Sequence, residues 1–96
     1  MSDLKVMHDE SGTKGRYTVV HPSGESVLSY ELIPPKRLIA EHTQVARGYE
    51  GDEIGLLMLR ELIADARNRG LQITPLCPFV SAQLRMHPEW ADVFSA

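Results

Sequence analysis

The first half of the chain alternates apolar and polar residues with a period of two, which is typical of strands that bury one face. Four such segments are separated by glycines and prolines, which favour turns. We expect strands at residues 4–9, 16–21, 26–33 and 36–45, joined by turns at 10–15, 22–25 and 34–35. The short connections predict successive hairpins, and therefore an antiparallel meander.

The alternation also assigns faces to the third and fourth strands. In the third strand Leu28, Tyr30 and Leu32 share one face. In the fourth strand Leu38, Ala40 and His42 share one face, and Ile39, Glu41 and Thr43 share the other.

After Val45 the apolar period changes to that of a helix. Apolar residues within 54–66 form two adjacent helical stripes, which together make one wide apolar face. Such a face predicts a long helix that is largely covered by the sheet. Gly70 is well placed to end this helix, and Arg67 and Arg69 suit the negative end of the helix dipole.

The last third of the chain predicts a strand at 71–74, a helix at 79–86 and a short apolar tail that docks on the body. The expected order is β-β-β-β-α-β-α. The fourth and fifth strands are joined through a helix, so we expect them to lie parallel and to splay apart around it. The fold class is α+β, a layer of helix on sheet, in one domain over residues 1–96.

Composition narrows the functional classes. Ten Lys and Arg against thirteen Asp and Glu give a net charge of −3, which argues against nucleic acid as a partner. No apolar run approaches the length of a membrane span and the N-terminus has no signal-peptide pattern, so we expect no membrane partner. One cysteine and four scattered histidines show no metal-binding spacing, so we expect no metal. A reducing compartment such as the cytoplasm suits a lone cysteine, and the sequence leaves the oligomeric state open.

A glycine-bearing turn at residues 48–55 (GYEGDEIG) leads into the long helix. A strand followed by such a turn and a helix N-terminus can hold a phosphate on backbone N–H groups. The alternative is an ordinary acidic first turn, in which Asp52 caps the helix and Glu53 favours its dipole without a ligand.

Three further residues could carry chemistry. Cys77 could act as a general acid or an acyl acceptor beside a thioester, or it could be a small buried apolar residue. His42 could be a general base, or a packed strand residue. His87, which precedes Pro88 and Glu89, could simply cap a helix.

Several of these segments together resemble the minimal, single-domain GNAT-type N-acetyltransferases. The resemblance rests on His42-Thr43-x-Val45, the glycine turn into a helix, the segment Gly70-Leu71-x-Ile73-x-Pro75-x-Cys77-Pro78-Phe79-Val80, and His87-Pro88-Glu89. It covers residues 17–93, and the Pro-x-Cys-Pro-Phe-Val segment is its most specific part.

The resemblance implies an acetyl-CoA-dependent N-acetyltransferase with acetyl-CoA bound where the fourth and fifth strands diverge. The acceptor would be the amine of a small molecule or peptide. The implied catalytic residues are Cys77 and His42. The implied cofactor-binding residues are Thr43, Gln44, Val45, Glu50, Gly51, Asp52, Glu53, Ile54, Gly55 and Pro78.

The acidic turn departs from the pattern of the family. Without gaps, Glu53 occupies the position of a usual glycine, and Asp52 one that is often basic or an amide. A register that uses Arg47 and Gly48 in a longer turn is the other possibility. The alternative function is therefore a non-catalytic module of the same fold, which binds CoA weakly or binds a protein partner.

Overall fold

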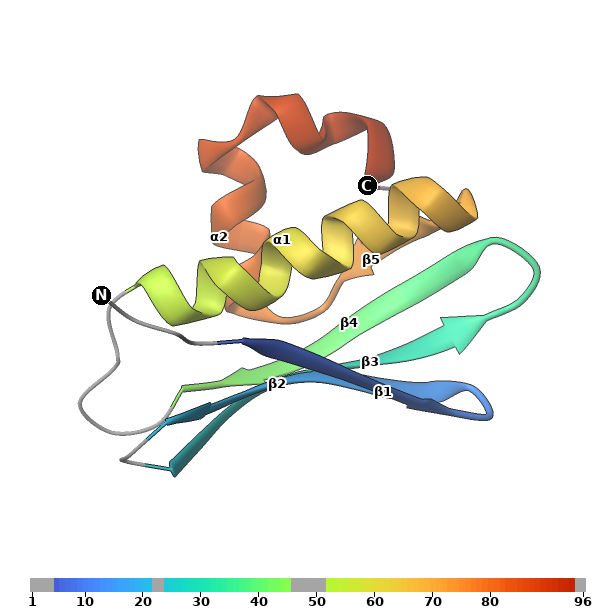
Figure 1. The fold of residues 1–96 in the computed structure, drawn as a ribbon. Coiled ribbons are helices and arrows are strands. Elements are labelled where there is room, and N and C mark those ends of the chain that lie inside the picture. Colours follow the sequence, from blue (N-terminus) through green and yellow to red (C-terminus); the bar gives the residue numbers. More distant parts are fainter. Residues whose placement is uncertain (1–4, 22–23, 46–51, 95–96) are drawn as a thin grey trace.

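A five-stranded sheet forms the base of the fold in the computed structural model, which describes residues 5–21, 24–45 and 52–94. Figure 1 shows the sheet with the long helix lying across it. The strands are β1 (Val6–Ser11), β2 (Lys14–His21), β3 (Gly24–Ile33), β4 (Arg37–Gln44) and β5 (Gln72–Pro75). The helices are α1 (Asp52–Arg69), α2 (Pro78–Met86) and the 3-10 helix η1 (Pro88–Val93).

The strands follow one another in the sheet in chain order, β1-β2-β3-β4-β5. The first four are antiparallel, and β5 joins β4 in parallel after the α1 crossover, so the predicted order and the parallel pairing are confirmed. The predicted six-residue first turn is wrong. Strands β1 and β2 pair up to Ser11 and Lys14, because Gly12 adopts a φ of 61° that closes a tight two-residue turn.

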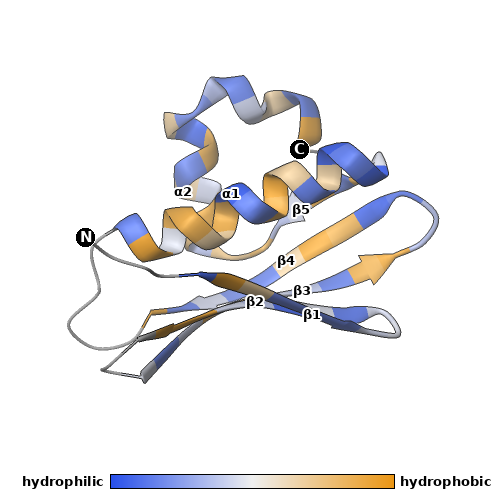
Figure 2. Ribbon diagram, in the orientation of Figure 1, coloured by the Kyte–Doolittle hydropathy of each residue, from blue (hydrophilic) through white to orange (hydrophobic). Residues whose placement is uncertain are grey.

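The core lies between the sheet and α1. Six apolar side chains of α1 are buried there: Ile54, Met58, Leu59, Leu62, Ile63 and Ala66. They meet buried residues of the strands, including Tyr17, Val19, Leu28, Tyr30, Leu38 and Ala40. Figure 2 shows apolar segments on α1 and on the middle of β4, the two elements that border this core. The wide apolar face predicted for the long helix is therefore confirmed.

The chain end docks on the body as predicted. Trp90, Val93 and Phe94 are buried, and Phe94 forms a parallel bridge with Ile73 of β5. Arg67 of α1 holds this end from outside through Asp92, at 2.9–3.0 Å.

The opposite face of the β1–β4 meander carries no helix in the part of the chain that the structure describes (Figure 1). Arg16 and Val20 of β2 are exposed on this face, and Ser29 of β3 is half-buried. We call it the uncovered face below.

Candidate functional site

Strands β4 and β5 separate after four residue pairs. The last pair is Ala40 with Pro75, and the Ala40 carbonyl then accepts hydrogen bonds from the N–H groups of Leu76 and Cys77, both at 3.1 Å. Beyond this point β4 continues to Gln44 beside β3, whereas the segment that follows β5 turns away into α2. The edge of β4 past Ala40 therefore has no described strand beside it, and a wedge opens there. We call this wedge the β4/β5 cleft.

An irregularity in β4 lies at the same place. Tyr30 of β3 pairs with Ala40, but the neighbouring Ser29 pairs with His42, so Glu41 is an extra residue. A bulge of one residue reverses which face the following side chains take. His42 then lies opposite Ser29, and Thr43 lies opposite the buried Leu28.

The predicted alternation along the fourth strand is consequently wrong after Ala40. His42 does not share a face with Ala40, because the extra residue at Glu41 shifts the period. Its side chain is exposed and makes no hydrogen bond or ion pair with any other residue that the structure describes. Thr43, expected on the opposite side, takes the core side instead.

Cys77 and Thr43 meet at the base of the cleft. Cys77 is 4% exposed, and its Sγ–H donates to Thr43 Oγ1 at 3.2 Å. Cys77 is the residue before α2, in extended conformation, and Pro78 begins the helix. The thiol thus lies between β4 and the start of α2, with one defined partner. Among the described residues, no hydrogen bond joins His42 to this thiol.

The first turn of α1 supplies backbone N–H groups that have no partner within the helix. Ile54 is buried and anchors this turn in the core, whereas the Glu53 side chain is exposed. The backbone of Asp52 starts the helix, and Glu50 and Gly51 lie outside the described residues. The acidic side chain at Glu53 therefore faces water.

Gly55 has a packing role that sequence reasoning missed. A Cβ at this position would lie 2.6 Å from Cζ of Phe79, which is closer than carbon atoms approach. The glycine lets α1 and the beginning of α2 come together beside the cleft. Its spacing from Gly51 suggested a phosphate turn, and no local signal points to an aromatic ring 24 positions later in the chain.

The remaining predicted cofactor-binding residues line up along β4 and at the start of α2. Gln44 and Pro78 are exposed, and Val45 is half-buried against the core. Leu76, which sequence analysis did not single out, is 65% exposed directly before Cys77. An apolar side chain left in water at the separation of two strands is suited to contact an apolar ligand segment.

A polar network braces the sheet on the side facing α1. The Tyr30 hydroxyl donates to Glu10 at 2.7 Å and lies 2.5 Å from Nε2 of His8. The Tyr17 hydroxyl donates to Asp65 of α1 at 2.9 Å. Burial, and then these carboxylates, raise the pKa of both tyrosines well above its usual value. No motif signals this network, because its members come from four different elements.

The described residues include neither a metal-binding group nor a membrane-spanning helix. No group of three or more His, Cys, Asp or Glu side chains there could hold a metal ion. None of the helices in the described ranges has the length and apolar character needed to cross a membrane.

The arrangement as a whole defines a class of protein. An antiparallel meander, a helix, and a parallel fifth strand that splays from the fourth are the elements expected of an acyl-CoA N-acyltransferase fold. The model of the GCN5-related N-acetyltransferase family matches residues 16–93. The chain belongs to this family.

A solved structure has the same fold. It is the NMR solution structure of a GCN5-like protein from Staphylococcus aureus, described as a candidate N-acetyltransferase. The match covers 100% of this chain and 92% of the other, with a TM-score of 0.75 and 20% sequence identity. Among curated proteins no significant match is found. The resemblance and the α+β fold class expected from the sequence are confirmed.

Proposed function

We propose that this protein transfers the acetyl group of acetyl-CoA to an amine, with the β4/β5 cleft as the acetyl-CoA site. The family membership supports the reaction class. The observation that carries the proposal is the separation of β4 from β5 at Ala40, with Cys77 and Thr43 at its base and the first turn of α1 at its side.

The residues of the cleft fit the parts of acetyl-CoA. The pantetheine arm contains amides, and the free edge of β4 at Thr43–Val45 offers backbone groups that can pair with them. Leu76 and Pro78 supply apolar surface opposite. The pyrophosphate would take backbone N–H groups of residues 50–55, the turn and first turn of α1. When bound, acetyl-CoA supplies the thioester that acylates the amine.

The exposure of the Glu53 side chain determines how strongly the acidic turn opposes binding of the pyrophosphate. Two unit charges about 6 Å apart repel by roughly 3 kcal/mol at an effective dielectric of about 20, but by only about 0.7 kcal/mol in water. Because the Glu53 side chain is exposed, the lower figure is the better guide. The expected loss of affinity is then about threefold rather than a hundredfold, which leaves useful binding.

The two faces of β4 divide the proton transfers between them. The amine must lose a proton to attack the thioester carbonyl, and the departing thiolate must gain one. His42, exposed on the uncovered face, is placed to accept a proton from an amine arriving on that side. Cys77 holds an Sγ–H at the base of the cleft, oriented by Thr43, and can return a proton to the thiolate.

Calorimetric titration with acetyl-CoA is the first test. Micromolar or tighter binding supports the enzyme, and absence of heat at millimolar acetyl-CoA would favour a non-catalytic module of the same fold. The matched variant Glu53→Gln removes one charge at an exposed site and should tighten binding about threefold. A hundredfold gain would show instead that the carboxylate lies against the pyrophosphate.

The role of Cys77 is tested by turnover. Release of free CoA thiol is followed with a panel of amines, amino acids and peptides as acceptors. We expect Cys77→Ala to lower kcat at least tenfold with little change in KM for acetyl-CoA, and Thr43→Val to have a smaller effect in the same direction. Unaltered kcat in a folded Cys77→Ala variant would remove the thiol from the mechanism.

A further inference from the structure

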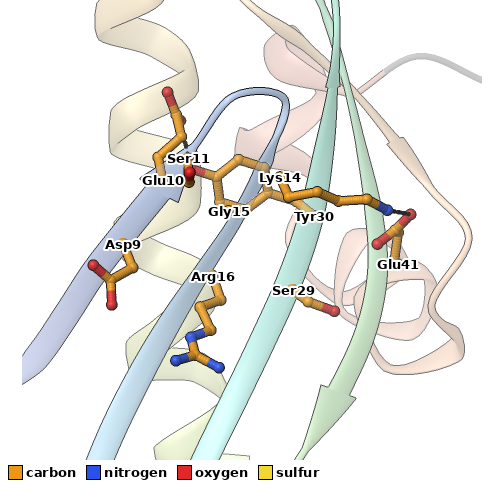
Figure 3. A pocket seen from close by; sticks show the side chains of 9 residues that line it. All are labelled: Asp9, Glu10, Ser11, Lys14, Gly15, Arg16, Ser29, Tyr30 and Glu41. Carbon is orange, nitrogen blue, oxygen red and sulfur yellow. Dashed lines mark hydrogen bonds and ion pairs between the residues drawn. The ribbon is translucent and has the colours of Figure 1, made fainter.

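A pocket of about 380 Å³ opens among the strands β1 to β4 (Figure 3). This volume falls in the range of small-molecule sites. Nine residues line it: Asp9, Glu10, Ser11, Lys14, Gly15, Arg16, Ser29, Tyr30 and Glu41. Figure 3 shows α1 behind the sheet, with the side chains of Arg16, Ser29 and Glu41 in front of it. The pocket is therefore reached from the uncovered face.

The charges in this pocket are only partly used by the protein. Lys14 is shared between two carboxylates, Glu31 at 3.2 Å and Glu41 at 3.5 Å. Arg16 and Asp9 are paired across neighbouring strands, yet neither side chain forms an ion pair within the described ranges. The pocket thus holds two uncommitted charges, the Arg16 guanidinium on β2 and the Asp9 carboxylate on β1, and on β4 the Glu41 carboxylate with one long and shared contact.

The position of the pocket relative to the cleft follows from the sheet register. Glu10, Gly15, Tyr30, Ala40 and Pro75 form one continuous row across all five strands. This is the row at which β5 leaves β4. Glu41, the extra residue of the bulge, follows directly after it. The pocket and the cleft therefore meet at β4, approached from different sides.

From these observations we propose that the pocket is the acceptor site, and that the acceptor is a small molecule carrying both a primary amine and a carboxylate. This proposal rests on the proposed acetyltransferase function. Arg16 binds the carboxylate, because a guanidinium forms two parallel hydrogen bonds with it. Glu41 holds the amine beside the bulge, and His42 follows it on the same face of β4.

The distance between Arg16 and Glu41 limits the length of the acceptor. Neighbouring strands lie about 4.8 Å apart, so the backbones of β2 and β4 are about 10 Å apart. Side chains from both strands shorten the gap, and an ω-amino acid with a chain of four or five carbons fits it better than glycine does. Lys14 beside Glu41 offsets part of the carboxylate charge, so Glu41 binds the ammonium of the acceptor less strongly than an isolated carboxylate would, which eases the loss of a proton before transfer.

The proposal is tested by titrating the ¹⁵N-labelled full chain with 5-aminopentanoate. We expect amide shifts at Arg16, Ser29 and Glu41, and binding at least tenfold tighter than that of pentanoate or pentylamine, which each lack one charge. Arg16→Ala should weaken binding of 5-aminopentanoate at least tenfold. The control Arg37→Ala removes an exposed arginine of β4 outside the pocket and should change nothing.

The outcomes separate this proposal from the function on which it rests. No shift of pocket amides at about 10 mM probe, a concentration at which millimolar binding is still seen, overturns it. Equal binding by Arg16→Ala and the intact protein also overturns it. Acetyl-CoA is titrated separately and should move amides at Thr43, Ile54 and Cys77. Probe binding in the pocket without acetyl-CoA binding would overturn the acceptor role together with the acetyltransferase function.

Discussion

Replacing Gly15 by alanine tests how tightly the sheet is fitted around Tyr30. A Cβ at Gly15 would lie 2.2 Å from Cζ, 2.3 Å from the hydroxyl oxygen and 2.7 Å from Cε1 of Tyr30. Carbon atoms in contact are normally about 3.5–4 Å apart, so the ring would have to move by more than 1 Å. Tyr30 is 1% exposed, and its hydroxyl is held by Glu10 and His8. The ring therefore has little room to yield.

The magnitude follows from what this movement breaks. The hydrogen bond to the Glu10 carboxylate is worth about 1.5–3 kcal/mol and the one to His8 about 1 kcal/mol. Overpacking that remains after relaxation adds to this loss. Alanine also restricts the unfolded chain, which offsets about 0.5–1 kcal/mol of the lost stability. We expect Gly15→Ala to lower the free energy of unfolding by about 2–4 kcal/mol, or the melting temperature by roughly 10–30 °C.

Urea and thermal unfolding followed by circular dichroism measure this loss. The matched control is Gly15→Ala in a Tyr30→Leu background, where the far end of the ring is gone and the same substitution should cost less than about 1 kcal/mol. If Gly15→Ala costs less than about 0.5 kcal/mol in the intact chain, or costs as much without the ring as with it, the steric reasoning is refuted.

Two other predictions concern α1 and β1. For Gly55→Ala we expect a change of less than about 1 kcal/mol in unfolding free energy. The gain in helix propensity offsets the cost of the close contact with Phe79, because this half-buried ring can shift. A loss above about 2 kcal/mol in urea unfolding would contradict this. The hydrogen bond from Arg69, and then that from Tyr30, lower the pKa of Glu10 below its usual value. The stabilisation by the Glu10 carboxylate is complete above its unfolded pKa of about 4.5 and is lost as pH falls through the lower folded value. Glu10→Gln should therefore flatten the fall in unfolding free energy at acid pH, and an unchanged slope below pH 5 would argue against this role of Glu10.

Much of the architecture follows from local sequence signals. The order of strands and helices, the covered face of α1 and the parallel fifth strand were all predicted, because period and turn chemistry are properties of neighbouring residues. Element boundaries differ by one or two residues at most ends, where hairpin pairing extends a strand. The first turn shows this, since Gly12 closes it more tightly than six turn-forming residues suggest.

The candidate site depends more on the tertiary structure. Strict alternation placed His42 on the same face as Ala40, but one extra residue at Glu41 reverses the faces, and a bulge has no reliable local signal. The contact between Cys77 and Thr43 joins residues 34 positions apart and exists only in this strand register. Gly55 beside Phe79 is likewise a matter of packing.

By itself the sequence determined the fold class, the apolar faces of the helix and of the strands up to the bulge, and the resemblance to the family, since these depend on residue type and spacing. The tertiary structure decided which side of β4 each polar residue takes, what Cys77 contacts, and that the Glu53 carboxylate faces water. It also assembled a pocket on the uncovered face from four strands. The faces of β4, the contact of Cys77 with Thr43 and the pocket arise from strand register, which no single segment specifies, because pairing is settled between strands and not within them. The exposure of Glu53 arises from how α1 packs on the sheet.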